Sequence, residues 1–312
     1  MAFVEPVRAH FANPLWRYLS ATRLPFLSIT FVACLIGLAC ASASGIAINP
    51  ATAWLTLFFA LVTHAGVNVL NDYYDFCNGA DAHNEERLYP FTGGSRFIVN
   101  GVLSEREMKV FGYSLLLSTI PAGVLLMWFS ASGLFWIGCF GLFVAVAYSA
   151  PPLQLVSRGL GEPAILAGWL LIAVGADFVQ RGAFSAFPWG AGLPFALLVV
   201  NILYINQFPD RKSDAAVGKR TVIVRLGTKA ARWGYLWIAL FAYIWLLFAV
   251  LADWVPAFAA AGILALPISL AAARDLIRYA DKPGALRPAV LNTILAAHVS
   301  GLLTALGLRL SA

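Results

Sequence analysis

The sequence NDYYDFCNGAD, residues 71–81, stands where a long apolar run ends and a polar loop begins. A second stretch, NQFPDRKSD at residues 206–214, stands in the same kind of place. Both read Asn-x-x-x-Asp and continue to a further aspartate. Acidic residues at the margin of an apolar run are costly to bury in a membrane and therefore indicate a functional site. We expect the two acidic stretches to face one another across the fold.

The composition indicates an integral membrane protein. Of its 312 residues, 61% are hydrophobic and 12% are charged, whereas soluble domains carry about 25% charged residues. This length suits one multi-span domain that covers residues 1–312. The net charge of +6 is spread between the apolar runs. We therefore expect the lipid bilayer, and no nucleic acid, as the partner of most basic residues.

The chain begins with a segment, residues 1–24, that carries three arginines and no small-residue cleavage site followed by soluble sequence. It is interpreted as a cytoplasmic segment at the membrane interface rather than as a signal peptide. Because no targeting signal is visible, we expect the plasma (inner) membrane.

Nine apolar runs are candidates for membrane spans, since a helix needs about 20 such residues to cross the hydrocarbon core. The runs lie at residues 26–46, 52–72, 108–130, 134–150, 162–179, 187–206, 233–251, 256–272 and 289–308. The expected fold is an all-α membrane protein with nine transmembrane helices around a central cavity.

The basic residues segregate to one side when the N-terminus is placed in the cytoplasm. Of the 21 Lys and Arg residues, all except Arg181 and Arg309 then fall in cytoplasmic segments, as the positive-inside rule requires. The C-terminus is expected on the opposite face. Two cytoplasmic connections, residues 73–107 and 209–232, are long, and long loops in compact proteins are usually functional. We expect both loops to cap the cavity.

Helical spacing would place the polar residues of each stretch on one face. Asn206, Asp210 and Asp214 are spaced i, i+4 and i+8, which forms a stripe that drifts by about 80° over two turns of an α-helix. Asn71 and Asp75 share such a stripe. The helix of the first stretch is expected to end soon afterwards, so that its last aspartate reaches the site from the loop.

Carboxylates this close together repel one another unless a cation neutralises them. Mg²⁺ prefers oxygen ligands and usually binds through one or two carboxylates together with phosphate oxygens of a substrate. Two facing acidic stripes therefore suit Mg²⁺ ions that bridge to a diphosphate. The expected metal ligands are Asn71, Asp75, Asp81, Asn206, Asp210 and Asp214. The alternative is that each aspartate is only a polar residue at the membrane interface, but two copies at the same face argue against it.

These residues resemble the UbiA superfamily of intramembrane prenyltransferases. Residues 71–75 and 206–214 are similar to its two aspartate-rich motifs, and YSAPPL at 148–153 with RGLGE at 158–162 resembles its Tyr-x-x-Pro-Pro segment. The expected nine spans and two cytoplasmic loops agree as well.

Within that superfamily the chain is most similar to the 1,4-dihydroxy-2-naphthoate polyprenyltransferases of menaquinone biosynthesis. The similarity lies in DYYD followed by GAD, in TGGSR at 92–96 and in GVLS at 101–104. One feature departs from the family pattern: Gly79 stands where many members have a third aspartate, and Asp81 follows two residues later.

The resemblance implies Mg²⁺-dependent transfer of a polyprenyl group from polyprenyl diphosphate to a small aromatic acceptor. If the acceptor is 1,4-dihydroxy-2-naphthoate, it would lose CO₂ and give demethylmenaquinone. The implied catalytic residues are Asp75, Asp210 and Tyr148, the last because an aromatic face stabilises a cation. The implied diphosphate-binding residues are Arg87, Arg96, Lys212, Lys219 and Arg220. The implied acceptor-binding residues are Arg23, as partner of a carboxylate, and Asp72.

The sequence leaves other interpretations open. The acceptor could instead be 4-hydroxybenzoate, another phenol or haem. The basic residues could serve topology and lipid headgroups, and most tyrosines could pack in the bundle or at the interface. A transporter or lipid-binding membrane protein also carries intramembrane carboxylates in repeated halves. In such proteins the carboxylates lie near the midplane, whereas here they gather at one face.

Overall fold

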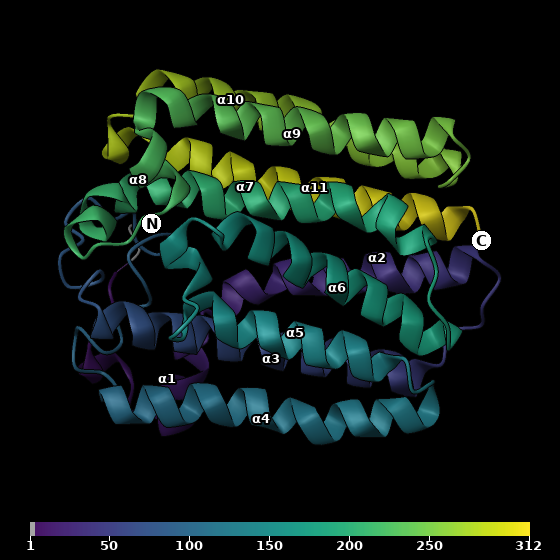
Figure 1. Cartoon of the computed structure of the whole chain (residues 1–312), viewed down its shortest axis with the longest axis horizontal. Helices are drawn as coiled ribbons and strands as arrows, with labels where there is room; N and C mark the ends of the chain where they lie inside the picture. Colours follow the sequence, from purple (N-terminus) through teal and green to yellow (C-terminus); the bar gives the residue numbers. More distant parts are fainter. Residues whose placement is uncertain (1–3) are drawn as a thin grey trace.

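The computed structural model describes residues 4–312, and within that range the chain is a bundle of helices without a β-strand (Figure 1). The α-helices are α1 (Pro14–Ala21), α2 (Ser28–Ala43), α3 (Pro50–Cys77), α4 (Glu105–Phe129), α5 (Leu134–Ser149), α6 (Gly161–Arg181), α7 (Phe187–Ala216), α8 (Val222–Leu226), α9 (Thr228–Leu251), α10 (Leu266–Tyr279) and α11 (Arg287–Leu310). Five 3-10 helices lie between them: η1 (Arg8–His10), η2 (Leu24–Leu27), η3 (Leu155–Arg158), η4 (Ala257–Ala265) and η5 (Pro283–Ala285). The expected all-α class is confirmed.

Eight helices in the described range are long and apolar enough to cross a membrane. They are α3, α4, α6, α7, α9 and α11, together with α2 preceded by η2 and α10 preceded by η4. The remaining predicted span corresponds to α5, which is apolar but only 16 residues long. It lies beside α6 along the bundle (Figure 1). Every apolar run thus folds as a helix, while a ninth crossing by α5 stays a prediction.

The helices that carry the acidic stretches continue past their apolar runs. α3 extends to Cys77 and α7 to Ala216, although the apolar runs stop at residues 72 and 206. Hydropathy shows which residues can lie in lipid, whereas the helical backbone continues for as long as helix-compatible residues follow. The additional turns therefore hold Asp75, Asp210 and Asp214 on rigid helical backbone.

Small residues let the helices pack closely. A Cβ added to Gly37 of α2 would lie 2.1 Å from the carbonyl oxygen of Ala173 on α6, and one on Gly301 of α11 would lie 2.4 Å from the Val32 side chain of α2. Such close approach through small residues is typical of helix packing in membranes. An extensive apolar core surrounds these contacts and includes the fully buried Phe195. The bundle therefore holds its interior side chains in fixed positions.

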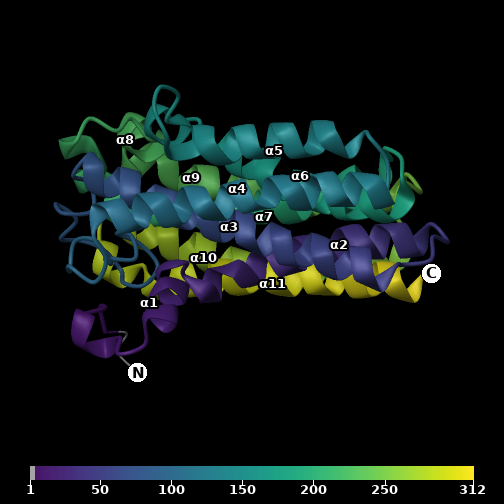
Figure 2. The same cartoon turned by 90° about the horizontal axis from the view of Figure 1, so that it is seen from below.

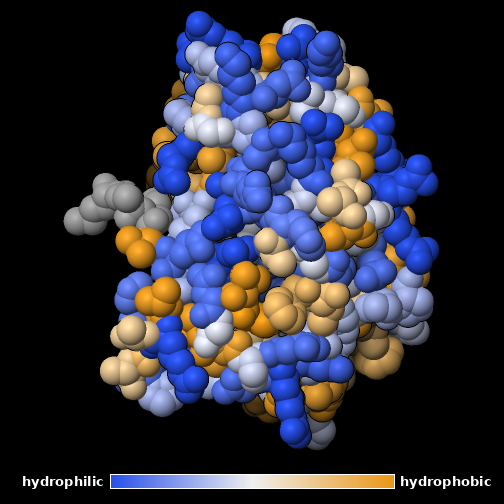
Figure 3. Space-filling model, turned by 90° about the vertical axis from the view of Figure 1, so that its left-hand side faces the viewer, coloured by the Kyte–Doolittle hydropathy of each residue, from blue (hydrophilic) through white to orange (hydrophobic). Residues whose placement is uncertain are grey.

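The sides of the bundle are apolar, whereas one end is polar. Large exposed side chains along the helices include Trp54, Trp128, Trp136, Phe241 and Phe248, and lipid is the solvent that tolerates them. The end that faces the viewer in Figure 3 instead shows hydrophilic residues over much of its surface. The chain is a multi-pass membrane protein.

The polar end brings together elements from distant parts of the sequence. It carries α1, α8 and the loop of residues 78–104 between α3 and α4, whereas α11 finishes at the opposite end (Figures 1 and 2). Both α3 and α7 finish at this polar end. The two acidic stretches therefore lie at the same end of the bundle, as expected.

Candidate active site

A cavity of about 520 Å³ opens inside the bundle at its polar end, a size typical of small-molecule sites. It lies among α3, α5, α6, α7 and α11, and residues of η2 and of the 78–104 loop also line it. Its polar part is lined by Arg23, Asn71, Asp75, Asp81, Asn206, Asp210, Asp214 and Lys219. Its apolar wall includes Val67, Ile165, Trp169, Val199 and Ile202. All six expected metal ligands thus line one space.

α7 presents the second acidic stretch as one stripe, as its spacing predicts. The carboxylate of Asp210 accepts a hydrogen bond from Nδ2 of Asn84 in the loop at 2.5 Å. Nδ2 of Asn206 donates to the carbonyl of Phe91 at 3.3 Å, and its buried Oδ1 has no hydrogen-bond partner among the described residues. With Asp214, the stripe offers two carboxylates and one free amide oxygen to the cavity.

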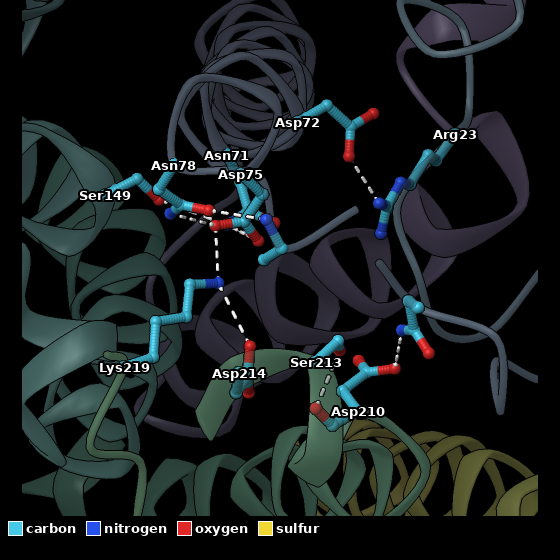
Figure 4. A network of polar contacts seen from close by, with 12 residues as sticks. Arg23, Asn71, Asp72, Asp75, Asn78, Ser149, Asp210, Ser213, Asp214 and Lys219 are labelled. Carbon is cyan, nitrogen blue, oxygen red and sulfur yellow. Dashed lines mark hydrogen bonds and ion pairs between the residues drawn. The ribbon is translucent and has the colours of Figure 1, made fainter. Parts of the chain in front are cut away.

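α3 presents Asn71 and Asp75 to the cavity and ends at Cys77, close to where the sequence predicts (Figure 4). Nδ2 of Asn71 donates to Oδ2 of Asp75 at 3.3 Å and to Oγ of Ser149 at 3.2 Å. Nδ2 of Asn78 donates to the other Asp75 oxygen at 3.3 Å. Two amides therefore orient the Asp75 carboxylate.

Asp81 returns to the cavity from the loop, as expected from its position after the helix end. It is 6% exposed and lines the polar part of the cavity. Burial, with the carboxylates of Asp75 and Asp72 nearby, raises the pKa of Asp81 well above its ordinary value. A bound cation would oppose both effects and favour the charged carboxylate.

Lys219 places an ammonium group between the two acidic stretches (Figure 4). Its Nζ lies 2.5 Å from Oδ1 of Asp75 and 3.3 Å from Oδ1 of Asp214. Burial disfavours the charge of this side chain, which is 6% exposed, but the two carboxylates outweigh burial and raise the pKa of Lys219. Lys219 is therefore a charged group at the centre of the site.

Arg23 lines the cavity immediately before η2, with a left-handed backbone at φ 57°. Its Nη2 donates to Oδ1 of Asp72, and Oδ2 of Asp72 accepts from the backbone N–H of Ser95 at 3.2 Å. Asp72 is not among the described residues that line the cavity. The two residues expected to bind the acceptor thus differ: Arg23 reaches the cavity, and Asp72 holds Arg23 in place.

Arg87 and Arg96, which were expected to bind diphosphate, are not among the described residues that line the cavity. Arg87 donates through Nε to the Glu5 carboxylate at 2.7 Å and through Nη1 to the carbonyl of Asn84 at 2.6 Å. Nη1 of Arg96 donates to the carbonyl of Asp81, and its Nε lies 3.7 Å from Glu5. Sequence reasoning missed Glu5, because no spacing or motif connects the N-terminal segment with this loop.

Two further cations expected to bind diphosphate are exposed. The Lys212 side chain is 68% exposed and pairs with Glu86 at 2.5 Å. Arg220 is exposed, and its backbone N–H donates to the carbonyl of Ser157 at 2.7 Å. Among the Lys and Arg residues of the described chain, Arg23 and Lys219 alone line the cavity.

The cavity wall beyond the acidic residues carries aromatic side chains and few polar groups. Tyr148 of α5 is 9% exposed and lines the cavity. Nδ1 of His64 shares a hydrogen bond of 2.8 Å with the hydroxyl of Thr30, and its ring meets Trp169 edge-on with centroids 5.1 Å apart. An apolar wall with sparse polar groups suits a largely hydrocarbon ligand.

The polar part of the cavity fits a divalent cation that shares its coordination with an anion. Across residues 4–312, no three His, Cys, Asp or Glu side chains converge closely enough to hold a metal by themselves. The oxygen donors form two groups, one from α3 and its loop and one from α7, and Oδ1 of Asn206 has a free lone pair. This arrangement suits a hard divalent cation that binds a few carboxylates and completes its coordination shell with phosphate oxygens.

Comparison with known proteins defines the class of protein. Residues 16–294 match the UbiA prenyltransferase family. The chain belongs to this family, and it is a prenyltransferase. The interpretation as a transporter or lipid-binding protein is thereby set aside.

Two curated relatives share a name. The chain is 28% identical over 306 residues to the 1,4-dihydroxy-2-naphthoate octaprenyltransferase of Escherichia coli (strain K12), covering 94% of this chain and 95% of that one. It is 27% identical over 264 residues to the protein of the same name from Haemophilus influenzae, covering 81% and 82%. The fold is also similar to a solved UbiA homolog from Archaeoglobus fulgidus bound to DMAPP and Mg²⁺, with a TM-score of 0.60 at 14% identity over 92% of this chain and 99% of that one.

Gly94 leaves the space that the Asp81 carboxylate occupies. Its φ is +74°, and an added Cβ would lie 2.2 Å from Oδ2 of Asp81. Gly94→Ala is expected to displace Asp81 and to lower the rate of prenyl transfer at least about tenfold, a loss of roughly 1.4 kcal/mol in transition-state stabilisation. The measurement is the initial rate in membranes that contain equal amounts of each variant.

Gly101→Ala is the matched control for this substitution. Gly101 lies in the same loop at φ +64°, but its added Cβ would meet no atom within 4 Å. Its cost is that of the left-handed backbone alone, about 1–2 kcal/mol in folding stability. Equal rates for the two alanine variants would show that the contact with Asp81 is unimportant.

Proposed function

We propose that this enzyme transfers a polyprenyl group from polyprenyl diphosphate to 1,4-dihydroxy-2-naphthoate, with loss of CO₂, to give demethylmenaquinol, the reduced form of demethylmenaquinone. The observation that carries the proposal is the meeting of the acidic stretches of α3 and α7 over one cavity whose remaining wall is largely apolar. Such a cavity suits a ligand with an anionic end and a long apolar tail. Similarity to the two naphthoate octaprenyltransferases supports this choice of acceptor.

The diphosphate would lie at the polar end of the cavity. The residues that would hold Mg²⁺ are Asn71, Asp75, Asp81, Asn206, Asp210 and Asp214. The ion would supply positive charge that stabilises the diphosphate as a leaving group. Lys219 would add charge-assisted hydrogen bonds to the same oxygens. We also propose that the diphosphate contacts four basic residues outside the cavity lining, namely Arg87, Arg96, Lys212 and Arg220. The first three must leave their glutamate partners before they can bind the diphosphate.

The reacting carbon would lie where the polar and apolar parts of the cavity meet. Cleavage of its C–O bond releases diphosphate and leaves an allylic cation. The ring of Tyr148 would stabilise this cation through its π face, and the apolar wall around Trp169 would exclude water, which would otherwise capture it. The chain thus protects the cation until the acceptor reacts.

The acceptor would be held by Arg23. An arginine fork matches the geometry of a carboxylate and binds it through two hydrogen bonds. The electron-rich ring carbon that bears the carboxylate attacks the allylic cation and forms the new C–C bond. Loss of CO₂ then returns the electron pair of the C–C(carboxylate) bond to the ring, so no external proton or oxidant is needed. The same site would serve 4-hydroxybenzoate, another phenol or haem only if each fits beside Arg23.

The acceptor is tested directly by activity in membranes. Membranes containing the full chain are incubated with Mg²⁺, a radiolabelled polyprenyl diphosphate and a panel of acceptors: 1,4-dihydroxy-2-naphthoate, 4-hydroxybenzoate and haem. We expect a labelled lipid-soluble product with the naphthoate alone, with release of one CO₂ per prenyl group transferred. A product with 4-hydroxybenzoate or haem and none with the naphthoate would replace the proposed acceptor.

We also propose that residues 1–312 form one intramembrane domain in the plasma (inner) membrane, with the active site at the cytoplasmic face. The distribution of Lys and Arg supports this orientation. A C-terminal fusion to alkaline phosphatase, which is active only outside the cytoplasm, is therefore expected to be active. The same fusion after residue 217 serves as the cytoplasmic control and is expected to be inactive. The opposite pattern would reverse the proposed orientation.

A further inference from the structure

A sharp turn after α7 places Lys219 in the cavity. After α7 ends at Ala216, Gly218 adopts a left-handed φ of +79°, and the backbone N–H of Lys219 returns to the carbonyl of Asp214 at 2.9 Å. The side chain then enters the cavity, while the next residue, Arg220, is exposed. Two adjacent basic residues thus have opposite placements, and the turn selects Lys219 for the interior.

The surroundings of Lys219 are strongly acidic. Its ammonium contacts Asp75 of α3 at 2.5 Å and Asp214 of α7 at 3.3 Å, so one cation joins the two helices (Figure 4). Asp81 and Asp210 line the same part of the cavity. Buried carboxylates without a counter-charge are strongly destabilising. Among the ion pairs of the described chain, Lys219 is the only basic residue that pairs with Asp75 or Asp214.

We propose that Lys219 is the internal counter-ion of the metal-free site and that it competes with Mg²⁺ for the carboxylates of Asp75 and Asp214. A divalent cation that arrives alone must displace this ammonium and leave it buried without a partner. When diphosphate arrives as well, its oxygens accept the ammonium and free the carboxylates for the metal. Lys219 thus couples metal binding to diphosphate binding.

This inference rests on the proposed function in taking diphosphate as the incoming anion. It adds a thermodynamic consequence, because a shared side chain makes the two bindings mutually dependent. Metal affinity is expected to be low in the absence of diphosphate and to rise when diphosphate is present. If Lys219 only contacted the diphosphate, its replacement would change the affinity for diphosphate. The affinity for the metal alone would then stay unaltered.

The experiment measures Mn²⁺ binding to the purified full chain in detergent by electron paramagnetic resonance, with and without inorganic pyrophosphate. For the unaltered protein, pyrophosphate is expected to increase Mn²⁺ affinity at least about tenfold. Lys219→Gln removes the charge but retains an N–H donor for the two carboxylates. This variant is expected to bind Mn²⁺ alone at least about tenfold more tightly than the unaltered protein, because the carboxylates have lost their internal cation.

The matched control is Lys229→Gln, which removes an exposed lysine at the start of α9 that does not line the cavity. Its Mn²⁺ affinities are expected to equal those of the unaltered protein. Lys219→Arg, which keeps the charge, is expected to retain weak binding of Mn²⁺ alone. If Lys219→Gln binds Mn²⁺ alone no more tightly than the unaltered protein, the counter-ion role is wrong.

The unfolding temperature is a second measurement, and it remains informative even if Lys219→Gln is less stable. Without metal, this variant is expected to unfold at a lower temperature than the unaltered protein, and Mn²⁺ alone is expected to restore most of the difference. Destabilisation that Mn²⁺ does not reverse would overturn the proposal. Because these measurements need no aromatic acceptor, their outcome is independent of whether the naphthoate proves to be the substrate.

Discussion

Asp210→Asn is expected to lower prenyl transfer at least about a thousandfold, equivalent to roughly 4 kcal/mol in the activation barrier. Asp210 lies on α7, lines the cavity and accepts a hydrogen bond from Asn84 at 2.5 Å. The asparagine keeps the size of the side chain but removes the negative charge that a divalent cation requires. The measurement is the rate of prenyl transfer at saturating Mg²⁺, and Asp75→Asn is expected to show a loss of similar size.

Asp275→Asn is the matched control, because it makes the same chemical change on α10 at an aspartate that pairs with Arg274 away from the cavity. It is expected to retain nearly full activity. Thermal unfolding of all three variants shows whether the fold is intact. A well-folded Asp210→Asn protein with a rate within tenfold of the unaltered protein would exclude Asp210 from the proposed site.

Arg23→Met is expected to destabilise the protein by about 3 kcal/mol, because it leaves the buried carboxylate of Asp72 without its cation. The Asp72 side chain is 4% exposed, and Arg23 is its ion-pair partner. The double variant Arg23→Met/Asp72→Asn removes the unpaired charge and is expected to recover most of the lost stability. The measurement is the free energy of unfolding in detergent for the single variants and the double variant.

The same pair of variants separates a structural role of Arg23 from binding of the acceptor. If Arg23 holds the acceptor carboxylate, the KM for the naphthoate is expected to rise at least about tenfold in Arg23→Met, since a charged hydrogen bond is worth about 1.5–3 kcal/mol. It is expected to stay raised in the double variant, although stability returns. A KM that returns with stability would leave Arg23 with only a supporting role.

Local properties of the sequence predicted much of the fold. Apolar runs located α5 and the eight long apolar helices of the described chain, because length and hydropathy decide whether a segment can lie in lipid. Helical periodicity placed Asn206, Asp210 and Asp214 on one stripe, because that spacing depends on the α-helix alone. Hydropathy alone placed the ends of α3 and α7 too early, because both helices continue into polar residues that hydropathy does not distinguish from loop.

Basic residues were the least predictable part of the candidate site. Arg87 and Lys212 were expected to bind diphosphate, yet each pairs with a glutamate and neither is among the described residues that line the cavity. Glu5 and Glu86 carry no motif, so their pairing depends on how distant segments meet. The role of each of these cations in the reaction stays a prediction.

The sequence by itself determined that this protein is a helical membrane protein with two acidic stretches at one face, because composition, periodicity and the side preference of Lys and Arg are local properties. Only the tertiary structure decided that the stretches share one cavity, that Arg23 reaches it while Asp72 supports Arg23, and that Lys219 joins Asp75 to Asp214. Such contacts depend on which helices pack side by side and on the turns between them. The energies that select this packing are summed over many residues far apart in the chain.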